Sequence, residues 1–207
     1  MPETSDTVLT DAAMDRLDAQ MAFLMEADRL KTILRATPIA DDSRPENSAE
    51  HSWHLALFAL VLGDHAPAGV DVNRVIRMLL LHDLVEIDAG DVPLYAAAAV
   101  DAEAIAAREQ AAADRIFGLL PTDQERAFRA LWDEFEAAVS PDARFAKALD
   151  RFQPPNLNLA SGGGSWRDYA VDWPTFEGRI APRVSPAAPA LWAWLAPKVR
   201  AFLGGPR

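Results

Sequence analysis

The sequence predicts an all-α protein that folds as a single helical bundle. Apolar residues recur at helical spacing along nearly the whole chain, and no segment shows the alternation of apolar and polar residues that marks a half-buried strand. Half of the 207 residues are hydrophobic, which is typical of a globular protein with a packed core. No long linker divides the chain, so we expect one domain over residues 1–207, with its core at about 30–151 and with helices and loops of 152–207 packed on it.

Three helices are expected in the N-terminal half. The first, over about residues 17–34, carries apolar side chains on one face. A polar segment with prolines, residues 38–47, separates it from the second helix, which ends near Gly63. Asp71 is a suitable N-cap for the third, which is apolar on most sides and is therefore expected to be a buried central helix.

The C-terminal half is expected to be helical as well, over residues 101–120, 123–139 and 141–151 and again in the tail from Ser185. Pro154 and Pro155 predict a loop, and Pro197 predicts a kink or break in the tail. The triple glycine at 162–164 is expected to form a surface turn, because it lacks the Lys-Ser/Thr pair of a phosphate-binding loop.

Charge and composition restrict the ligands. A formal net charge of −11 repels nucleic acids and anionic membranes, so neither is expected as a partner. A small phosphate ligand remains compatible, because a metal and a few arginines can reverse the field in a cleft. Cysteine is absent, so any metal must bind to histidine and carboxylate.

The chain carries no segment expected to direct it to a membrane or out of the cell. Its first residues are acidic and are not followed by an apolar run, so a secretory signal is not expected. No uninterrupted apolar stretch reaches the length of a membrane span. These observations predict a cytoplasmic location.

The most informative polar residues are His82 and Asp83, which interrupt the apolar run from Met78 to Val85. Burying an aspartate there is costly unless something compensates its charge. A divalent cation would do so, because it pairs with the carboxylate and accepts an imidazole nitrogen. A buried His–Asp hydrogen bond without metal is the alternative.

Three further residues favour the metal. His51 offers a second imidazole from the preceding helix, and Asp150 follows another apolar stretch. Glu86 lies one turn beyond His82 on the same helix face, where it could orient or deprotonate a water molecule.

These segments resemble a known family. Residues 44–53 (RPENSAEHSW), residues 82–91 (HDLVEIDAGD) and the pair Leu149-Asp150 are similar to the HD-domain metal-dependent phosphohydrolases, and most similar to the branch of the 5'-deoxynucleotidases. The resemblance spans about residues 30–151. It implies an all-helical fold and a divalent metal held by four side chains, His51, His82, Asp83 and Asp150.

The resemblance also implies a reaction. In that branch a water near the metal attacks the phosphorus of a nucleoside 5'-monophosphate and releases the nucleoside. Glu86 and Asp91 match the acidic residues that assist the water or the leaving hydroxyl. A metal would polarise the phosphoryl oxygens and lower the pKa of its water.

The phosphate-binding arginine of the family lies upstream of the first histidine, where this chain has Arg35 and Arg44. Arg35 is preferred because it follows the run from Leu30 to Leu34, whereas Arg44 could instead pair with Glu46 or Glu50 and brace the loop. Two further candidates for substrate contact follow from their positions in the sequence, Trp53 beside His51 and Lys147 beside Asp150.

We expect one metal ion, since the remaining histidines, His54 and His65, are poorly placed to bind a second. Two imidazoles and two carboxylates suit Mn, Fe, Co, Ni or Mg better than a structural zinc. A symmetric homodimer is also expected, because the stretch Leu191–Leu195 has more apolar surface than one helix face can bury and because members of the resembled branch are commonly dimers.

Two alternatives to a nucleoside monophosphatase remain open. The same fold could hydrolyse another phosphate ester, such as a nucleoside triphosphate or a cyclic dinucleotide, although few basic residues are present to neutralise a triphosphate. The chain could also be a metal- and nucleotide-binding sensor without turnover. The presence of both Glu86 and Asp91 argues against the sensor, which needs ligands but no acid–base pair.

Overall fold

The computed structural model describes residues 10–96 and 101–204, and nearly all regular structure in them is helical, which confirms the all-α fold class. The α-helices are α1 (Asp11–Asp28), α2 (Ser48–Leu62), α3 (Val72–Leu81), α4 (Glu86–Ala89), α5 (Ala102–Phe117), α6 (Thr122–Ala137), α7 (Pro141–Ala160), α8 (Ser165–Asp168), α9 (Trp173–Ala187) and α10 (Pro189–Leu203). Short 3₁₀ turns lie at Arg29–Thr32, Gly63–His65 and His82–Val85.

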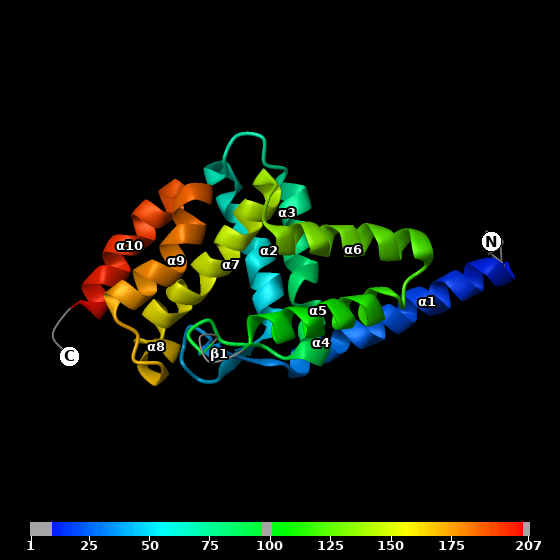
Figure 1. Cartoon of the computed structure of the whole chain (residues 1–207), viewed down its shortest axis with the longest axis horizontal. Coiled ribbons are helices and arrows are strands. Elements are labelled where there is room, and N and C mark those ends of the chain that lie inside the picture. The colour runs from blue at the N-terminus through cyan, green and yellow to red at the C-terminus, as the bar shows by residue number, and fades with distance from the viewer. Residues whose placement is uncertain (1–9, 97–100, 205–207) are drawn as a thin grey trace, which may run out of the picture.

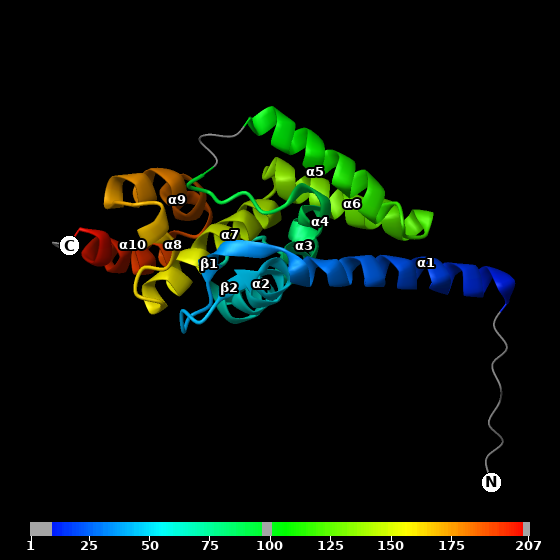
Figure 2. The same ribbon diagram turned by 90° about the horizontal axis from the view of Figure 1, so that it is seen from below.

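Helices α2, α3 and α7 form the centre of the molecule, with α9 and α10 at one end and α1, α5 and α6 at the other (Figure 1). α3 contacts α2, α6 and α7, and its Val75, Met78 and Leu79 are fully buried. The expected central helix is therefore confirmed, although Leu80 remains half exposed on its remaining side. Figure 2 shows α1 extending along one side of the molecule beneath α5 and α6.

A small antiparallel sheet lies between α1 and α2, where the sequence predicts only a helix end and a polar break. Strands β1 (Leu34–Pro38) and β2 (Pro45–Asn47) pair with an irregular register. The prediction failed because strands of five and three residues are too short to show an alternating pattern. This ribbon places Arg35 and Glu46 beside the N-terminal end of α2.

The loop predicted at Pro154 and Pro155 and the break predicted at Pro197 are both wrong. α7 continues through Pro154 and Pro155, and α10 passes Pro197 without a break. A proline inside a helix removes one backbone hydrogen bond. Here α9 packs along α7, and Pro155 is itself buried, so tertiary packing outweighs the local cost.

The glycine run at 162–164 is not the surface turn that we expected. Gly163 and Gly164 are buried, and a Cβ atom on Gly164 would overlap the side-chain oxygen of Asn158. That oxygen accepts hydrogen bonds from the backbone N–H and the hydroxyl of Ser165, so glycine allows the turn to close against α7. No helix within the described ranges is long and apolar enough to cross a membrane.

Candidate metal centre and phosphate cavity

Three separate elements bring histidine and aspartate side chains together at the centre of the bundle. His51 lies in the first turn of α2, His82 and Asp83 lie at the end of α3, and Asp150 lies in α7. All four are buried, and His51 is completely enclosed. The structure thus brings together the four residues that we expected to be metal ligands.

Local structure fixes the position of each histidine. Asn47 caps α2 through a capping box with Glu50, which sets the start of the helix that carries His51. At His82 the chain changes from α-helix to a 3₁₀ turn, whose backbone is held by Trp132. The indole N–H of that buried tryptophan donates to the His82 carbonyl at 3.1 Å.

The side chains of these residues converge at short distances. His51 Nε2 lies 3.1 Å from Asp150 Oδ1, and His82 Nε2 lies 2.9 Å from Asp83 Oδ1 and 3.9 Å from Asp150 Oδ1. Potential ligand atoms of His51, His82 and Asp83 all lie within 4.8 Å of one another. Such an arrangement of two imidazoles and two carboxylates can coordinate one divalent cation.

The hydrogen bonding of His82 fits such a cation. Its Nδ1 lies 2.8 Å from the carbonyl of Leu79, which can only accept, so Nδ1 carries a proton and Nε2 is the nitrogen that faces Asp83 and Asp150. Buried Nε2 has no hydrogen-bond partner among the described residues. A cation bound by Nε2 and the two carboxylates would satisfy this buried nitrogen.

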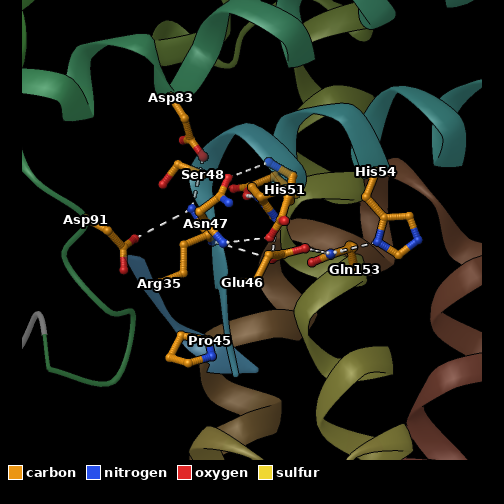
Figure 3. A network of polar contacts seen from close by, with 12 residues as sticks. Arg35, Pro45, Glu46, Asn47, Ser48, His51, His54, Asp83, Asp91 and Gln153 are labelled. Atoms are coloured by element: carbon orange, nitrogen blue, oxygen red, sulfur yellow. Dashed lines mark hydrogen bonds and ion pairs between the residues drawn. The ribbon is translucent and has the colours of Figure 1, made fainter. Parts of the chain in front are cut away.

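Arg35 on β1 lies beside this centre and is surrounded by carboxylates. Its Nη1 lies 2.9 Å from Asp83 Oδ2 and 3.6 Å from Asp91 Oδ1; Figure 3 shows Arg35 beside both aspartates. The same nitrogen lies 3.7 Å from Glu86 Oε1. Burial opposes the charge of Arg35, yet these neighbours raise its pKa. Arg35 is therefore a fixed positive charge within the group of acids.

A cavity of about 230 Å³ opens beside the centre and is lined by residues of β1, the 3₁₀ turn His82–Val85, helices α4 to α9 and the segment after α4. Its charged lining consists of six carboxylates and three cations, namely Asp83, Glu86, Asp91, Glu109, Glu136 and Asp150 against Arg35, Lys147 and Arg151. This excess of negative charge would repel a phosphate. A divalent cation at the base of the cavity would reverse the local field.

Glu86 and Asp91 line the cavity next to Arg35, and the pKa of each is raised above its ordinary value. Burial and the neighbouring Asp83 raise the pKa of Glu86 to about 9, although Arg35 opposes the shift. The hydroxyl of Ser48 donates to Glu86 Oε2 at 2.5 Å. Burial likewise raises the pKa of Asp91.

The pKa values of the two aspartates of the metal centre, Asp83 and Asp150, are instead lowered. Burial opposes ionisation of Asp83, but His82 and Arg35 hold its pKa well below the ordinary value. Asp150 is also buried, and Arg151 together with His51 lowers its pKa. Both carboxylates are therefore ionised, as metal ligands must be.

The structure separates the candidate substrate-binding residues. Arg35 and Lys147 line the cavity, where Lys147 pairs with Glu136 at 2.9 Å. Arg44 does not line it; its exposed guanidinium binds Glu50, which is the bracing role that the sequence also allowed. Trp53, expected to line the cleft, lies outside the cavity lining and is 61% exposed.

Sequence reasoning missed three polar residues around the centre. Ser48 binds Glu86, Glu46 is 2% exposed and lies 3.3 Å from His51, and Gln153 is fully buried. Gln153 was hidden because it lies next to Pro154 in the predicted loop. Glu46 was considered only as a partner of Arg44, because the pairing of β1 with β2 was not predicted.

The helical fold and the cluster of histidine and aspartate at the end of its central helix are typical of a helical metal-binding domain. The chain belongs to the HD domain family, which it matches over residues 27–192. This family assignment implies a divalent metal.

Individual relatives support the assignment. The chain is 45% identical to a structure described as a predicted metal-dependent phosphohydrolase from Magnetospirillum magnetotacticum MS-1, with a TM-score of 0.84 over 91% of this chain and 98% of that one. It is 31% identical to human 5'-deoxynucleotidase HDDC2 over 63% of this chain and 62% of the human protein. Schizosaccharomyces pombe 5'-deoxynucleotidase hdd1 is 24% identical over 63% of this chain and 66% of its own length.

Proposed function

We propose that this protein is a metal-dependent phosphohydrolase that removes the 5'-phosphate of a (deoxy)nucleoside 5'-monophosphate. One observation carries the proposal: two histidines and two aspartates converge beside a buried arginine at a cavity whose lining is otherwise too acidic for a phosphate. The names of the curated relatives, which are 5'-deoxynucleotidases, support this substrate class.

In this proposal one divalent cation is held by His51, His82, Asp83 and Asp150. A cation there would polarise the phosphoryl oxygens and acidify a water molecule. The mixed nitrogen and oxygen ligands suit Mn, Fe, Co, Ni or Mg. A single ion is proposed because the other histidines are not at the site: His54 contacts Gln153, and His65 is half exposed beside Asp64.

Other residues of the chain bind the phosphate and transfer the protons. Arg35 binds the phosphate, because it is a fixed cation on the cavity wall next to the metal centre. Glu86 accepts a proton from the attacking water, as the P–O bond to the nucleoside breaks and a new P–O bond forms. Asp91, whose pKa is raised, supplies a proton to the leaving 5'-oxygen, so the products are a nucleoside and phosphate. Lys147 is a second candidate for contact with the phosphate.

A substrate panel tests this function. The metal-stripped protein would be incubated with nucleoside mono-, di- and triphosphates and a cyclic dinucleotide, each with Mn²⁺, Co²⁺, Mg²⁺, Fe²⁺ or Ni²⁺. We expect phosphate release from the monophosphates only when a metal is added. Release of tripolyphosphate from triphosphates would instead indicate a nucleoside triphosphate hydrolase of the same fold. Binding without any turnover would indicate a sensor.

We also propose a homodimer. The apolar stretch that suggested it is partly packed within the chain, since Leu191 and Leu195 are buried and Trp192 is partly buried, whereas Ala193 and Trp194 are exposed. Trp194 joins Leu57 and Val61 of α2 in lining a second, apolar cavity of about 540 Å³. Trp53, Leu57, Leu60 and Val61 form an exposed stripe on α2 that supports the proposal. A cytoplasmic location is part of the same proposal.

A further inference from the structure

Three buried polar atoms lie together behind the metal centre. Glu46 Oε2, His51 Nδ1 and Arg35 Nε have no hydrogen-bond partner within the described residues. They are nevertheless neighbours, because Glu46 Oε2 lies 3.3 Å from His51 Nδ1 and 3.9 Å from Arg35 Nε. Buried donors and acceptors are costly to leave unpaired, so one carboxylate oxygen between two N–H groups points to a shared interaction.

The other oxygen of Glu46 is held in place from α7. Gln153 Nε2 donates to Glu46 Oε1 at 2.8 Å, and the same nitrogen lies 3.1 Å from His54 Nδ1 (Figure 3). Gln153 is fully buried, and Glu46 is 2% exposed. With Oε1 fixed by Gln153, Oε2 is turned toward His51 and Arg35.

Glu46 is not placed to be a ligand itself. It contacts the Nδ1 side of the His51 ring, whereas the Nε2 side faces Asp150. A carboxylate on the far nitrogen of a metal-binding imidazole fixes the tautomer and the ring orientation. His82 has the corresponding support from the Leu79 carbonyl on its own Nδ1.

We infer that Glu46 is a positioning residue that couples the metal centre to the phosphate-binding arginine, by accepting a hydrogen bond from His51 Nδ1–H and by forming an ion pair with Arg35 at Nε. This inference rests on the proposed function. The hydrogen bond directs the lone pair of His51 Nε2 toward the cation. The ion pair holds the Arg35 stem and leaves its terminal nitrogens to face the acids and the substrate.

The test compares Co²⁺ binding by three metal-free proteins: the wild type, Glu46→Gln and Glu50→Gln. Glutamine at position 46 keeps the size of the side chain, but it has one acceptor oxygen for Gln153 and His51 and no charge to pair with Arg35. Glu50 is the matched control, because it caps the same helix start and pairs with Arg44 without contacting His51. Calorimetry and the visible absorption of Co²⁺ report binding without any need for turnover.

We expect the Kd for Co²⁺ to rise by about 10- to 100-fold in Glu46→Gln and to stay close to the wild-type value in Glu50→Gln. A second readout is the His51 tautomer, measured by ¹⁵N NMR of the metal-free protein at a pH where the ring is neutral. The wild type should carry the proton on Nδ1, and Glu46→Gln should show a mixture. If Glu46→Gln does not fold, Glu46→Asp keeps the charge with a shorter reach and should weaken binding in the same direction.

Two results would overturn the inference while leaving the proposed function intact. Either Glu46→Gln binds Co²⁺ as tightly as the wild type with an unchanged tautomer, or Glu50→Gln loses as much affinity as Glu46→Gln. Failure of the wild type to bind Co²⁺ at all would instead overturn the proposed function, and the inference with it.

Discussion

Glu86 is the residue in which catalysis and stability conflict. It is buried beside Asp83 and Asp91, so its pKa rises to about 9 when no cation is present. A bound cation would lower that pKa again and allow the carboxylate to accept a proton near neutral pH. The same side chain is thus unfavourable for the metal-free fold and suited to activating water.

The first prediction concerns turnover. Glu86→Ala should retain the metal and the fold, bind nucleotide about as well as the wild type, and lose hydrolysis by roughly two to four orders of magnitude. The measurement is turnover at saturating nucleotide, with metal content determined on the same sample. Arg35 Nη1 lies 3.7 Å from Glu86, so a purely structural role is the competing explanation. Turnover near the wild-type rate would remove Glu86 from the mechanism.

The second prediction concerns pH. The pKa of Glu86 is raised from 4.5 to about 9 on folding, so between these values the folded protein binds more protons than the unfolded chain. Its contribution therefore lowers stability progressively as pH rises from about 4.5 to 9. Glu86→Gln can still accept the Ser48 hydrogen bond and removes this effect.

Thermal unfolding of the metal-free proteins from pH 5 to pH 9 should accordingly show Glu86→Gln melting above the wild type by a margin that grows with pH. The lowered pKa values of Asp83 and Asp150 act in both proteins and cancel in the comparison. A margin that stays constant or shrinks as pH rises would show that folding does not raise the pKa of Glu86.

At the scale of single residues, the sequence was informative wherever a charge interrupts an apolar run. His82, Asp83 and Asp150 are recognisable on that ground, because burial of a charge requires compensation. Glu46 and Gln153 carry no such signal. Their function depends on contacts between β1, β2 and α7. Glu46 and Gln153, for example, are more than a hundred residues apart in the sequence.

Among the elements, the start of α2 is decisive for the site, because His51 lies only one turn beyond its cap. The third prediction is that Asn47→Ala destabilises the protein by about 1 kcal/mol, measured by chemical denaturation, since the Asn47 side chain accepts from the Glu50 backbone N–H at 3.0 Å. Asn47→Ser is the control, because serine caps a helix about as well. A serine variant as unstable as the alanine variant would show that capping is not the cause.

Element boundaries were predictable where helices are amphipathic and have clear caps, as at Asp71 and Asp101. They were not predictable where tertiary contacts override local preference. α7 extends nine residues beyond its predicted end at 151, because α9 packs along it and Pro155 is buried. α9 itself was missed, since its apolar residues are interrupted by Pro182 and Pro186.

For the whole molecule, we propose one domain, because α9 and α10 share a hydrophobic core with α3 and α7. The fourth prediction is the homodimer. Trp53, Leu57, Leu60 and Val61 recur at helical spacing on α2 with exposures from 38% to 73%, an apolar stripe that a second copy could cover. Light scattering at high micromolar concentration should give twice the mass of one chain.

Leu60→Glu should shift that equilibrium to the monomer by placing a charge in the stripe. Val139→Glu is the matched control, because Val139 is 69% exposed but lies in the short connection between α6 and α7. The interface assignment would be wrong if both variants remained dimeric, and the dimer itself would be ruled out by a monomeric wild type.

The central claim is that a cation held by His51, His82, Asp83 and Asp150 is required for hydrolysis. The most direct test loads the wild type, Asp83→Ala and Asp88→Ala with Mn²⁺, removes free metal, and measures metal per chain and phosphate release from dAMP on the same samples. Asp88 is the control, because it binds Arg115 and does not line the cavity. We predict about one metal per chain and phosphate release in the wild type and in Asp88→Ala, and neither in Asp83→Ala. Stoichiometric metal in Asp83→Ala would contradict the ligand set, and hydrolysis by that variant without metal would contradict the claim as a whole.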